Sequence, residues 1–239
     1  MFYFLVPSIS SYDTVLVIAA VLPAVFLMVK VYRSDRLEKE SAGMLWRLVV
    51  AGVLSSLLAL VEERILVAVL DLTVTPYSRL YPILLYFGIV AFAEESSKYL
   101  LLSYSSWRSP EFNCQYDGVV YAVFVSLGFA LWENISYVMN YGFRTAILRA
   151  LTAIPGHACF GVFMGVFYGM ARRWENRGLR ERAKTCRIMA VVLPALLHGA
   201  YDYIASTRQG DVGFILFIVL LFALSYGLVG RMAKQDLSI

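Results

Sequence analysis

Seven apolar runs of 18 to 24 residues divide this 239-residue chain. A bilayer core about 30 Å thick needs roughly 20 apolar residues per helix, so each run is long enough to cross it. The runs are continuously apolar and do not alternate, which favours helices over barrel strands. We therefore predict an all-α, polytopic transmembrane helical bundle. The predicted spans are Val15–Tyr32, Leu48–Leu70, Tyr81–Tyr104, Val119–Asn140, Ile154–Ala171, Ile188–Ala205 and Val212–Val229.

The composition supports one domain embedded in a lipid bilayer. Apolar residues make up 60% of the chain and charged residues only 16%, whereas a soluble domain is nearer half and a quarter. The links between spans are too short for a second, soluble domain, so residues 1–239 are predicted to form a single integral membrane domain. The opening MFYFLVPSIS lacks a basic leader and a cleavage site, which predicts that the first span is retained.

Basic residues predict how the bundle is oriented in the cell membrane. Fourteen Lys and Arg residues fall in the links after spans one, three and five and in the tail; the alternate links carry four, at Arg79, Arg144, Arg149 and Arg208. The positive-inside rule then places the N-terminus outside and the C-terminus in the cytoplasm. The net charge of +4 is explained by this topology, so no nucleic-acid partner is expected. A short interfacial helix is expected at Tyr141–Leu151 on the outer face.

Ionisable side chains inside the predicted spans are the main functional signal. Each Asp, Lys or Arg at the centre of a spanning helix costs about 2.5–3.5 kcal/mol, and Glu should be comparable. A bundle built only for stability would not need them, yet both histidines of the chain are among them. These residues are Glu62, Glu63, Arg64, Glu94, Glu95, Lys98, Glu133, His157, His198 and Asp202.

Sequence spacing predicts which of these groups can meet. Glu94 and Lys98 are four residues apart on one helix face, as are His198 and Asp202. Glu95 points about 100° away from Glu94, so the two carboxylates should have different environments. Two acids held in different environments are what general acid–base chemistry needs.

Four spans bring their polar groups to overlapping depths in the predicted outer half of the membrane, which favours one shared, outward-opening cavity. In the fifth span, His157, Gly161, Gly165 and Gly169 follow one another at intervals of four. A ridge of small residues lets another helix approach closely. The ring of His157, at the top of this ridge, should therefore face protein and not lipid.

Other charged residues are expected to have structural roles. Glu62, Glu63 and Arg64 lie near the outer end of the second span, where snorkelling or an ion pair between neighbours would accommodate them. Asp117 begins the fourth span and is expected to be a helix N-cap. The three cysteines cannot all pair and are expected to be thiols.

The block from Phe92 to Asp202 resembles the PrsW family of intramembrane proteases, within the wider group of CAAX-prenyl-protease-like membrane enzymes. The matching pieces are EExxK at Glu94–Lys98, FxxxE at Phe129 and Glu133, the His157 segment, and HxxxD at His198 and Asp202. The wider group usually has FxxxH and HxxxN, with Arg in its first motif. The residues present here match the PrsW branch instead, which weakens any transfer of roles from the prenyl-protein enzymes.

The resemblance implies hydrolysis of a peptide bond by a glutamate-activated water, with no covalent intermediate and no cofactor. It also implies a membrane-anchored, single-span protein substrate, typically an anti-sigma factor cut near the outer surface in a signalling cascade. Spans three to six, residues 81–205, would form the catalytic core.

In this hypothesis Glu94 or Glu95 is the general base. His198, oriented by Asp202, would donate to the oxyanion or to the leaving amine. His157 would help to position the water, and Lys98 would keep a glutamate charged. Glu133 and Asn134 would complete the hydrogen-bond network.

Two other classes of protein stay open. A zinc-dependent membrane protease could use the two histidines and several glutamates, although HExxH and Cys–His metal spacings are absent from the sequence. A proton-coupled transporter could use the same buried Glu, His and Lys residues as a relay, although repeated halves are not evident. A non-catalytic receptor is a more distant possibility, because binding alone does not call for paired acids.

Overall fold

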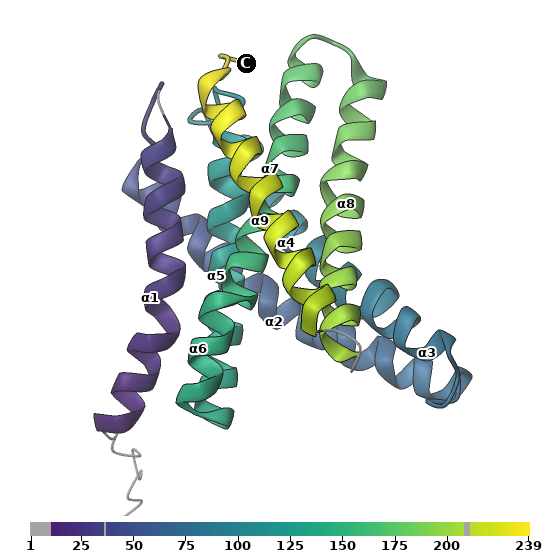
Figure 1. Ribbon diagram of the computed structural model, residues 1–239. Coiled ribbons are helices and arrows are strands. Elements are labelled where there is room, and N and C mark those ends of the chain that lie inside the picture. The colour runs from purple at the N-terminus through teal and green to yellow at the C-terminus, as the bar shows by residue number, and fades with distance from the viewer. Residues whose placement is uncertain (1–10, 36, 208–210) are drawn as a thin grey trace, which may run out of the picture.

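The computed structural model describes residues 11–35, 37–207 and 211–239, which form a bundle of helices (Figure 1). The predicted N-terminal opening, Met1–Ser10, and two of the charges used to predict orientation, Arg36 and Arg208, lie outside the described residues. The helices are α1 (Ser11–Ser34), α2 (Ala42–Thr73), α3 (Leu80–Ile83), the π-helix η1 (Leu84–Val90), α4 (Ala91–Ser106), α5 (Asp117–Tyr141), α6 (Phe143–Leu151), α7 (Ala153–Asn176), α8 (Arg180–Ser206) and α9 (Asp211–Lys234).

Six of the seven predicted spans are helices long and apolar enough to cross a membrane, which confirms the all-α transmembrane class. The third predicted span differs from the others. It is helical throughout, but the helix type changes along it: α3 is followed by the π-helix η1 and then by α4. The π-helical turns of η1 lie just before the acidic pair, Glu94 and Glu95. A π-turn carries more residues than an α-turn, so it changes which face the following side chains present. The hydropathy of the sequence carries no signal of such a turn.

Helix α5 is the centre of the bundle. Every residue from Asp117 to Ala130 is buried, and α5 packs against α1, α2, α4, α6 and α7. In Figure 1 it lies between α1 on one side and α7 with α9 on the other. Because α5 contacts so many elements, side chains that project from it can reach groups on several helices.

Glycine contacts bring α7 and α2 close to α5. A Cβ atom added at Gly165 would lie 2.4 Å from the carbonyl oxygen of Gly118, and one at Gly169 would lie 2.2 Å from that of Gln115. On another face of α5, a Cβ atom at Gly52 of α2 would lie 2.1 Å from the carbonyl oxygen of Val125. The backbones therefore touch at positions where no side chain fits, and the ridge predicted in the fifth span is a helix-packing surface.

Large apolar side chains cover the outside of the bundle. On α1, Leu22 and Phe26 are more than half exposed, and on α9 so are Ile215, Leu216 and Val219. Rows of exposed apolar residues on long helices would make a soluble protein aggregate, but they suit contact with lipid chains. The chain is therefore a multi-pass membrane protein.

The glycine contacts lead to a stability prediction. Gly165→Ala would force α5 and α7 apart and should cost about 1–3 kcal/mol, typical of overpacking. Gly227→Ala is the matched control, because Gly227 lies in helix α9 with nothing within 4 Å of an added Cβ. We expect a lower midpoint of thermal unfolding in detergent for Gly165→Ala and an unchanged or slightly higher one for Gly227→Ala. Equal midpoints for Gly165→Ala and the wild type would contradict this account of the α5–α7 contact.

Candidate active site

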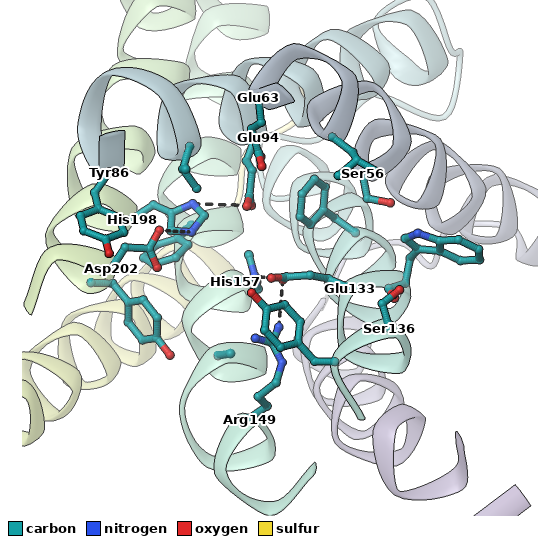
Figure 2. Close-up of a pocket in the computed structure, with 18 residues that line it drawn as sticks. Ser56, Glu63, Tyr86, Glu94, Glu133, Ser136, Arg149, His157, His198 and Asp202 are labelled. Carbon is teal, nitrogen blue, oxygen red and sulfur yellow. Dashed lines mark hydrogen bonds and ion pairs between the residues drawn. The ribbon is translucent and has the colours of Figure 1, made fainter. Parts of the chain in front are cut away.

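A cavity of about 470 Å³ collects acidic and basic side chains from six helices (Figure 2). It is lined by residues of α2, η1, α4, α5, α6, α7 and α8, with aromatic side chains such as Phe129, Trp132 and Phe160 between the polar ones. The acidic and basic residues that line it are Glu63, Glu94, Glu133, Arg149, His157, His198 and Asp202. The structure thus brings together five of the six residues that the sequence singled out as catalytic.

The Lys98 side chain lies directly behind this cavity and is completely buried. Its ammonium nitrogen lies 2.7 Å from Glu95 Oε1, 3.2 Å from Glu94 Oε2 and 3.2 Å from His157 Nδ1. An ammonium group has three N–H donors, so these three acceptors use all of them. The nitrogen also lies 4.0 Å from the centre of the Phe129 ring, a cation–π contact. The expected Glu94–Lys98 pair is present, but Lys98 also binds the second glutamate.

His157 joins the Lys98 cluster to α5. Because Lys98 can only donate, His157 Nδ1 must accept, which leaves the proton on Nε2. That nitrogen lies 2.9 Å from Glu133 Oε2, and the same oxygen lies 2.9 Å from Arg149 Nη2. Figure 2 shows this chain of contacts from His157 through Glu133 to Arg149. Both ring nitrogens of His157 are therefore occupied, and its ring faces protein as predicted.

His198 has carboxylates on both of its ring nitrogens. Nδ1 lies 3.0 Å from Glu95 Oε1 and 3.8 Å from Glu94 Oε2, while Nε2 lies 3.5 Å from Asp202 Oδ2. The Phe160 ring stacks on the imidazole at 4.7 Å between centres, which holds its plane. An imidazole between carboxylates can hold a proton and deliver it to a group that enters the cavity.

The adjacent glutamates have different positions relative to the cavity. Glu94 lines it, whereas Glu95 is fully buried behind it and is held by Lys98 and His198. The second oxygen of Glu95, Oε2, is buried without a hydrogen-bond partner. The expected 100° separation therefore places one carboxylate at the cavity wall and the other inside the protein, although both contact the same lysine.

Asn134 lies apart from the cavity. Its Nδ2 donates to the carbonyl oxygen of Ala20 on α1, and its Oδ1 accepts from Arg149 Nε at 2.9 Å. Asn134 therefore holds α1 against α5 and fixes Arg149, which in turn pairs with Glu133. It contributes to the network through Arg149 and does not line the cavity.

Two cavity residues were assigned other roles from the sequence. Glu63 of α2 lines the cavity and lies close enough to Glu94 for the two charges to interact, whereas Arg64 is exposed. No ion pair joins Glu62, Glu63 and Arg64, all of which the structure describes. Arg149, counted only as a topology charge, reaches Glu133 from the short helix α6. In the sequence, only the short interfacial helix expected at Tyr141–Leu151 could have indicated that Arg149 lies beside the site.

Comparisons with known proteins agree with the motifs. The family described as PrsW family intramembrane metalloprotease matches residues 40–227. The chain belongs to the PrsW family. Protease PrsW of Shouchella clausii is 34% identical over 212 residues, 88% of this chain and 93% of the relative. The Bacillus subtilis protease is 39% identical over 149 residues, 62% of this chain and 65% of the relative. No solved structure gives a significant match.

Membership of this family makes the chain a membrane-embedded peptidase, a hydrolase. The family description also names a metal, and one oxygen or nitrogen atom from each of Glu94, Glu95, His157 and His198 lies within 4.8 Å of the others. These four donor atoms, as they are arranged in this structure, do not fit a divalent metal. Glu94 Oε2, Glu95 Oε1 and His157 Nδ1 all contact the ammonium group of Lys98, which would repel a second cation at their centre.

The Lys98 cluster leads to a second prediction. Lys98→Met would leave Glu94 and Glu95 buried without their cation, and removing one partner of a buried ion pair costs about 3–5 kcal/mol. We expect the thermal unfolding midpoint in detergent to fall well below that of the wild type. Lys184→Met is the matched control, because Lys184 is exposed on α8. A Lys98→Met protein as stable as the Lys184→Met protein would show that the Lys98 contacts do not hold the helices together.

Proposed function

We propose that the cavity hydrolyses a peptide bond of a membrane-anchored protein with a water molecule activated by Glu94. The observation that carries this proposal is the position of Glu94. It is the member of the acidic pair that lines the cavity, while Glu95 is fully buried and bound by Lys98 and His198. A general base must lie within hydrogen-bond reach of the water it activates, and of the two glutamates only Glu94 lines the cavity that such a water would enter.

The proposed reaction proceeds without a covalent intermediate. Glu94 accepts a proton from water as the water oxygen attacks the carbonyl carbon. His198 keeps Nδ1 on Glu95 and donates from Nε2, whose contact with Asp202 is longer at 3.5 Å, to the developing oxyanion, while Phe160 holds the plane of the ring. The carbon–nitrogen bond then breaks, and the proton held by Glu94 passes to the leaving amine. The products are a carboxylic acid and an amine, which balances the water consumed.

The other polar groups of the site position Glu94 and His198. Lys98 holds the acidic pair, and His157 accepts from Lys98 while its other nitrogen contacts Glu133. Because both nitrogens of His157 are occupied, we propose that it supports Lys98 and Glu133 and does not bind the water. Residues 81–205 form the proposed catalytic core of the single membrane domain, and α2 adds Glu63 to it.

The substrate we propose is a single-span membrane protein, with an anti-sigma factor as the type suggested by the family resemblance. An enzyme whose site lies between membrane helices receives its substrate from the bilayer. The cavity is lined by α6 and by the ends of α5 and α7 next to it, which the charge distribution assigns to the outer side. Cleavage near the outer surface follows from this placement.

The proposed orientation has the N-terminus outside and the C-terminus in the cytoplasm. It rests on the excess of Lys and Arg in the links at one end of the bundle, including the α7–α8 link and the tail. A green fluorescent protein fused after Ile239 should fluoresce, because this reporter folds in the cytoplasm and not after export through the general secretory pathway. An alkaline phosphatase fusion at the same site should be inactive. The reverse pattern would overturn the orientation and the side of cleavage together.

The catalytic proposal is tested by coexpression with a panel of tagged single-span membrane proteins from the same genome. Wild-type protein should generate a new fragment from at least one of them. Glu94→Gln should lower the rate by about 10²–10⁴-fold, the usual contribution of a general base. The double variant Glu94→Gln/Glu95→Gln should be inactive although its membrane insertion is normal.

Glu62→Gln is the matched control for these variants. Glu62 lies on α2, accepts a hydrogen bond from Ser97 and does not line the cavity, so its variant should still cleave. A fully active double variant would end the proposal.

A zinc-dependent mechanism is the second candidate because the family description names a metalloprotease, although the Lys98 ammonium group contacts three of the four clustered donor residues. Cleavage by the purified protein should survive prolonged treatment with 1,10-phenanthroline if Glu94 acts on water alone. Loss of cleavage on chelation, restored by added zinc and not by magnesium, would favour the metal. Elemental analysis of the same preparation supplies the metal content of the active fraction.

A further inference from the structure

A second group of acidic side chains, buried or half-buried, lies far from the cavity. Asp35 follows α1, Glu40 precedes α2, Asp117 begins α5 and Asp236 follows α9; we name these four residues the carboxylate cluster. Asp117 and Glu133 are sixteen residues apart on α5, which separates the cluster from the cavity by about 24 Å along the helix. The cluster lies at the end of the bundle where the C-terminus is drawn (Figure 1).

The carboxylates of this cluster face one another. One oxygen from each of Asp35, Glu40 and Asp117 lies within 4.8 Å of the other two, and all three residues are buried. Glu40 lies near enough to Asp117 for the two negative charges to repel each other. Asp236 lies near enough for its charge to act on Asp35 and Asp117. Carboxylates this close cannot all be charged unless a positive group lies between them.

Part of each carboxylate is already used by the protein. Tyr121 donates to Glu40 Oε2 at 2.7 Å, and the backbone N–H groups of Asn113 and Cys114 donate to Asp117 Oδ2. Asp117 therefore fixes the preceding loop and is not the N-cap that the sequence predicted. Asp236 Oδ1 accepts from the N–H groups of Tyr116 and Leu237. These hydrogen bonds orient the carboxylates, and each uses one oxygen of Glu40, Asp117 or Asp236.

Asp35 is the member that points to a ligand. Its side chain is only 4% exposed, yet neither of its oxygens makes a hydrogen bond. Burial raises the pKa of Asp35 above its usual value, against the opposing effects of the Lys39 charge and of the backbone N–H groups of Leu37 and Glu38. The Oδ2 atom of Asp236 is likewise buried without a partner. A buried carboxylate oxygen with no donor is costly unless something else binds it.

No described basic residue supplies the missing charge. The Lys39 charge acts on Asp35, but its ammonium nitrogen is directed to the backbone carbonyl oxygens of Tyr32 and Asp35, at 2.6 and 2.5 Å. Within residues 11–35, 37–207 and 211–239, none of the four carboxylates forms an ion pair. Among the described residues, the cluster therefore presents several carboxylate oxygens to one another without a protein cation paired to them.

We infer that the carboxylate cluster is a structural binding site for a hard divalent cation, Mg²⁺ or Ca²⁺. Such cations take oxygen ligands almost exclusively, and carboxylates from separate segments with added waters are a usual ligand set. A bound cation would join the end of α1, the start of α2, the start of α5 and the C-terminal tail. The tail is already attached at this place, because Gln115 N donates to Leu237 O and Ile239 N donates to Asn113 O.

The binding test uses the full chain, purified in a non-ionic detergent and freed of metals with a chelator. Mn²⁺ serves as the probe, and its free fraction is measured by electron paramagnetic resonance. We expect one bound Mn²⁺ per wild-type chain and at least tenfold weaker binding by Asp35→Asn/Glu40→Gln. Glu94→Gln/Glu95→Gln should bind as the wild type does, which distinguishes this site from the active site. Glu181→Gln, which alters an exposed acid on α8, should also bind normally.

Thermal unfolding supplies the second measurement. Mg²⁺ or Ca²⁺, added separately, should raise the unfolding midpoint of the wild type and not that of Asp35→Asn/Glu40→Gln, and the larger rise identifies the preferred ion. Without cations this variant should be at least as stable as the wild type, because two buried like charges are gone. Asp236→Asn, which alters a half-buried residue of the tail, gives the same test if the double variant does not fold. Absence of stoichiometric Mn²⁺ binding by the wild type, or midpoints that no cation changes, would overturn the inference.

Discussion

The Lys98 ammonium group lies wholly inside the bundle and donates to two carboxylates of its own helix, α4, and to an imidazole of α7. Removing one charge from water costs several kcal/mol even after relaxation, so this arrangement is stable only when every donor has an acceptor. A shift of α4 relative to α7 that separates His157 from Lys98 would therefore leave one N–H donor of a buried ammonium group without an acceptor. The active-site geometry and the helix packing depend on the same contact.

Close backbone packing makes this register possible. Where Gly161 and Gly165 of α7 meet α5, added Cβ atoms would lie within 3.0 Å of Ser126, Ala122, Gly118 or Val119. The short interhelical distance lets His157 reach Glu133 on α5 while its other nitrogen faces Lys98. The glycines of α7 thus determine where the imidazole of His157 is held. Dispersion contacts and hydrogen bonds replace the hydrophobic effect as the force between these helices, since lipid is as apolar as the side chains themselves.

Much of the candidate site could be predicted because it depends on local spacing. Residues four apart share a helix face, and this rule alone pairs Glu94 with Lys98 and His198 with Asp202, as the structure confirms. Glu63 could not be assigned in this way, because its role depends on the tilt and rotation of α2 relative to α4. Arg149 could not either, since it reaches Glu133 from a separate short helix. The π-helical turns before the acidic pair likewise have no signature in hydropathy.

The sequence by itself determined the membrane class, six of the seven spans as continuous helices, and the set of polar residues that a bilayer would otherwise exclude. These follow from the cost of placing backbone or charge in lipid, which depends on composition and length alone. Only the tertiary structure decided which glutamate lines the cavity, that Lys98 lies between the clustered donors, and that Asp117 meets Asp35 and Glu40 at one end of the bundle. Those outcomes depend on helix rotation and crossing, which are set by contacts between segments far apart in the chain.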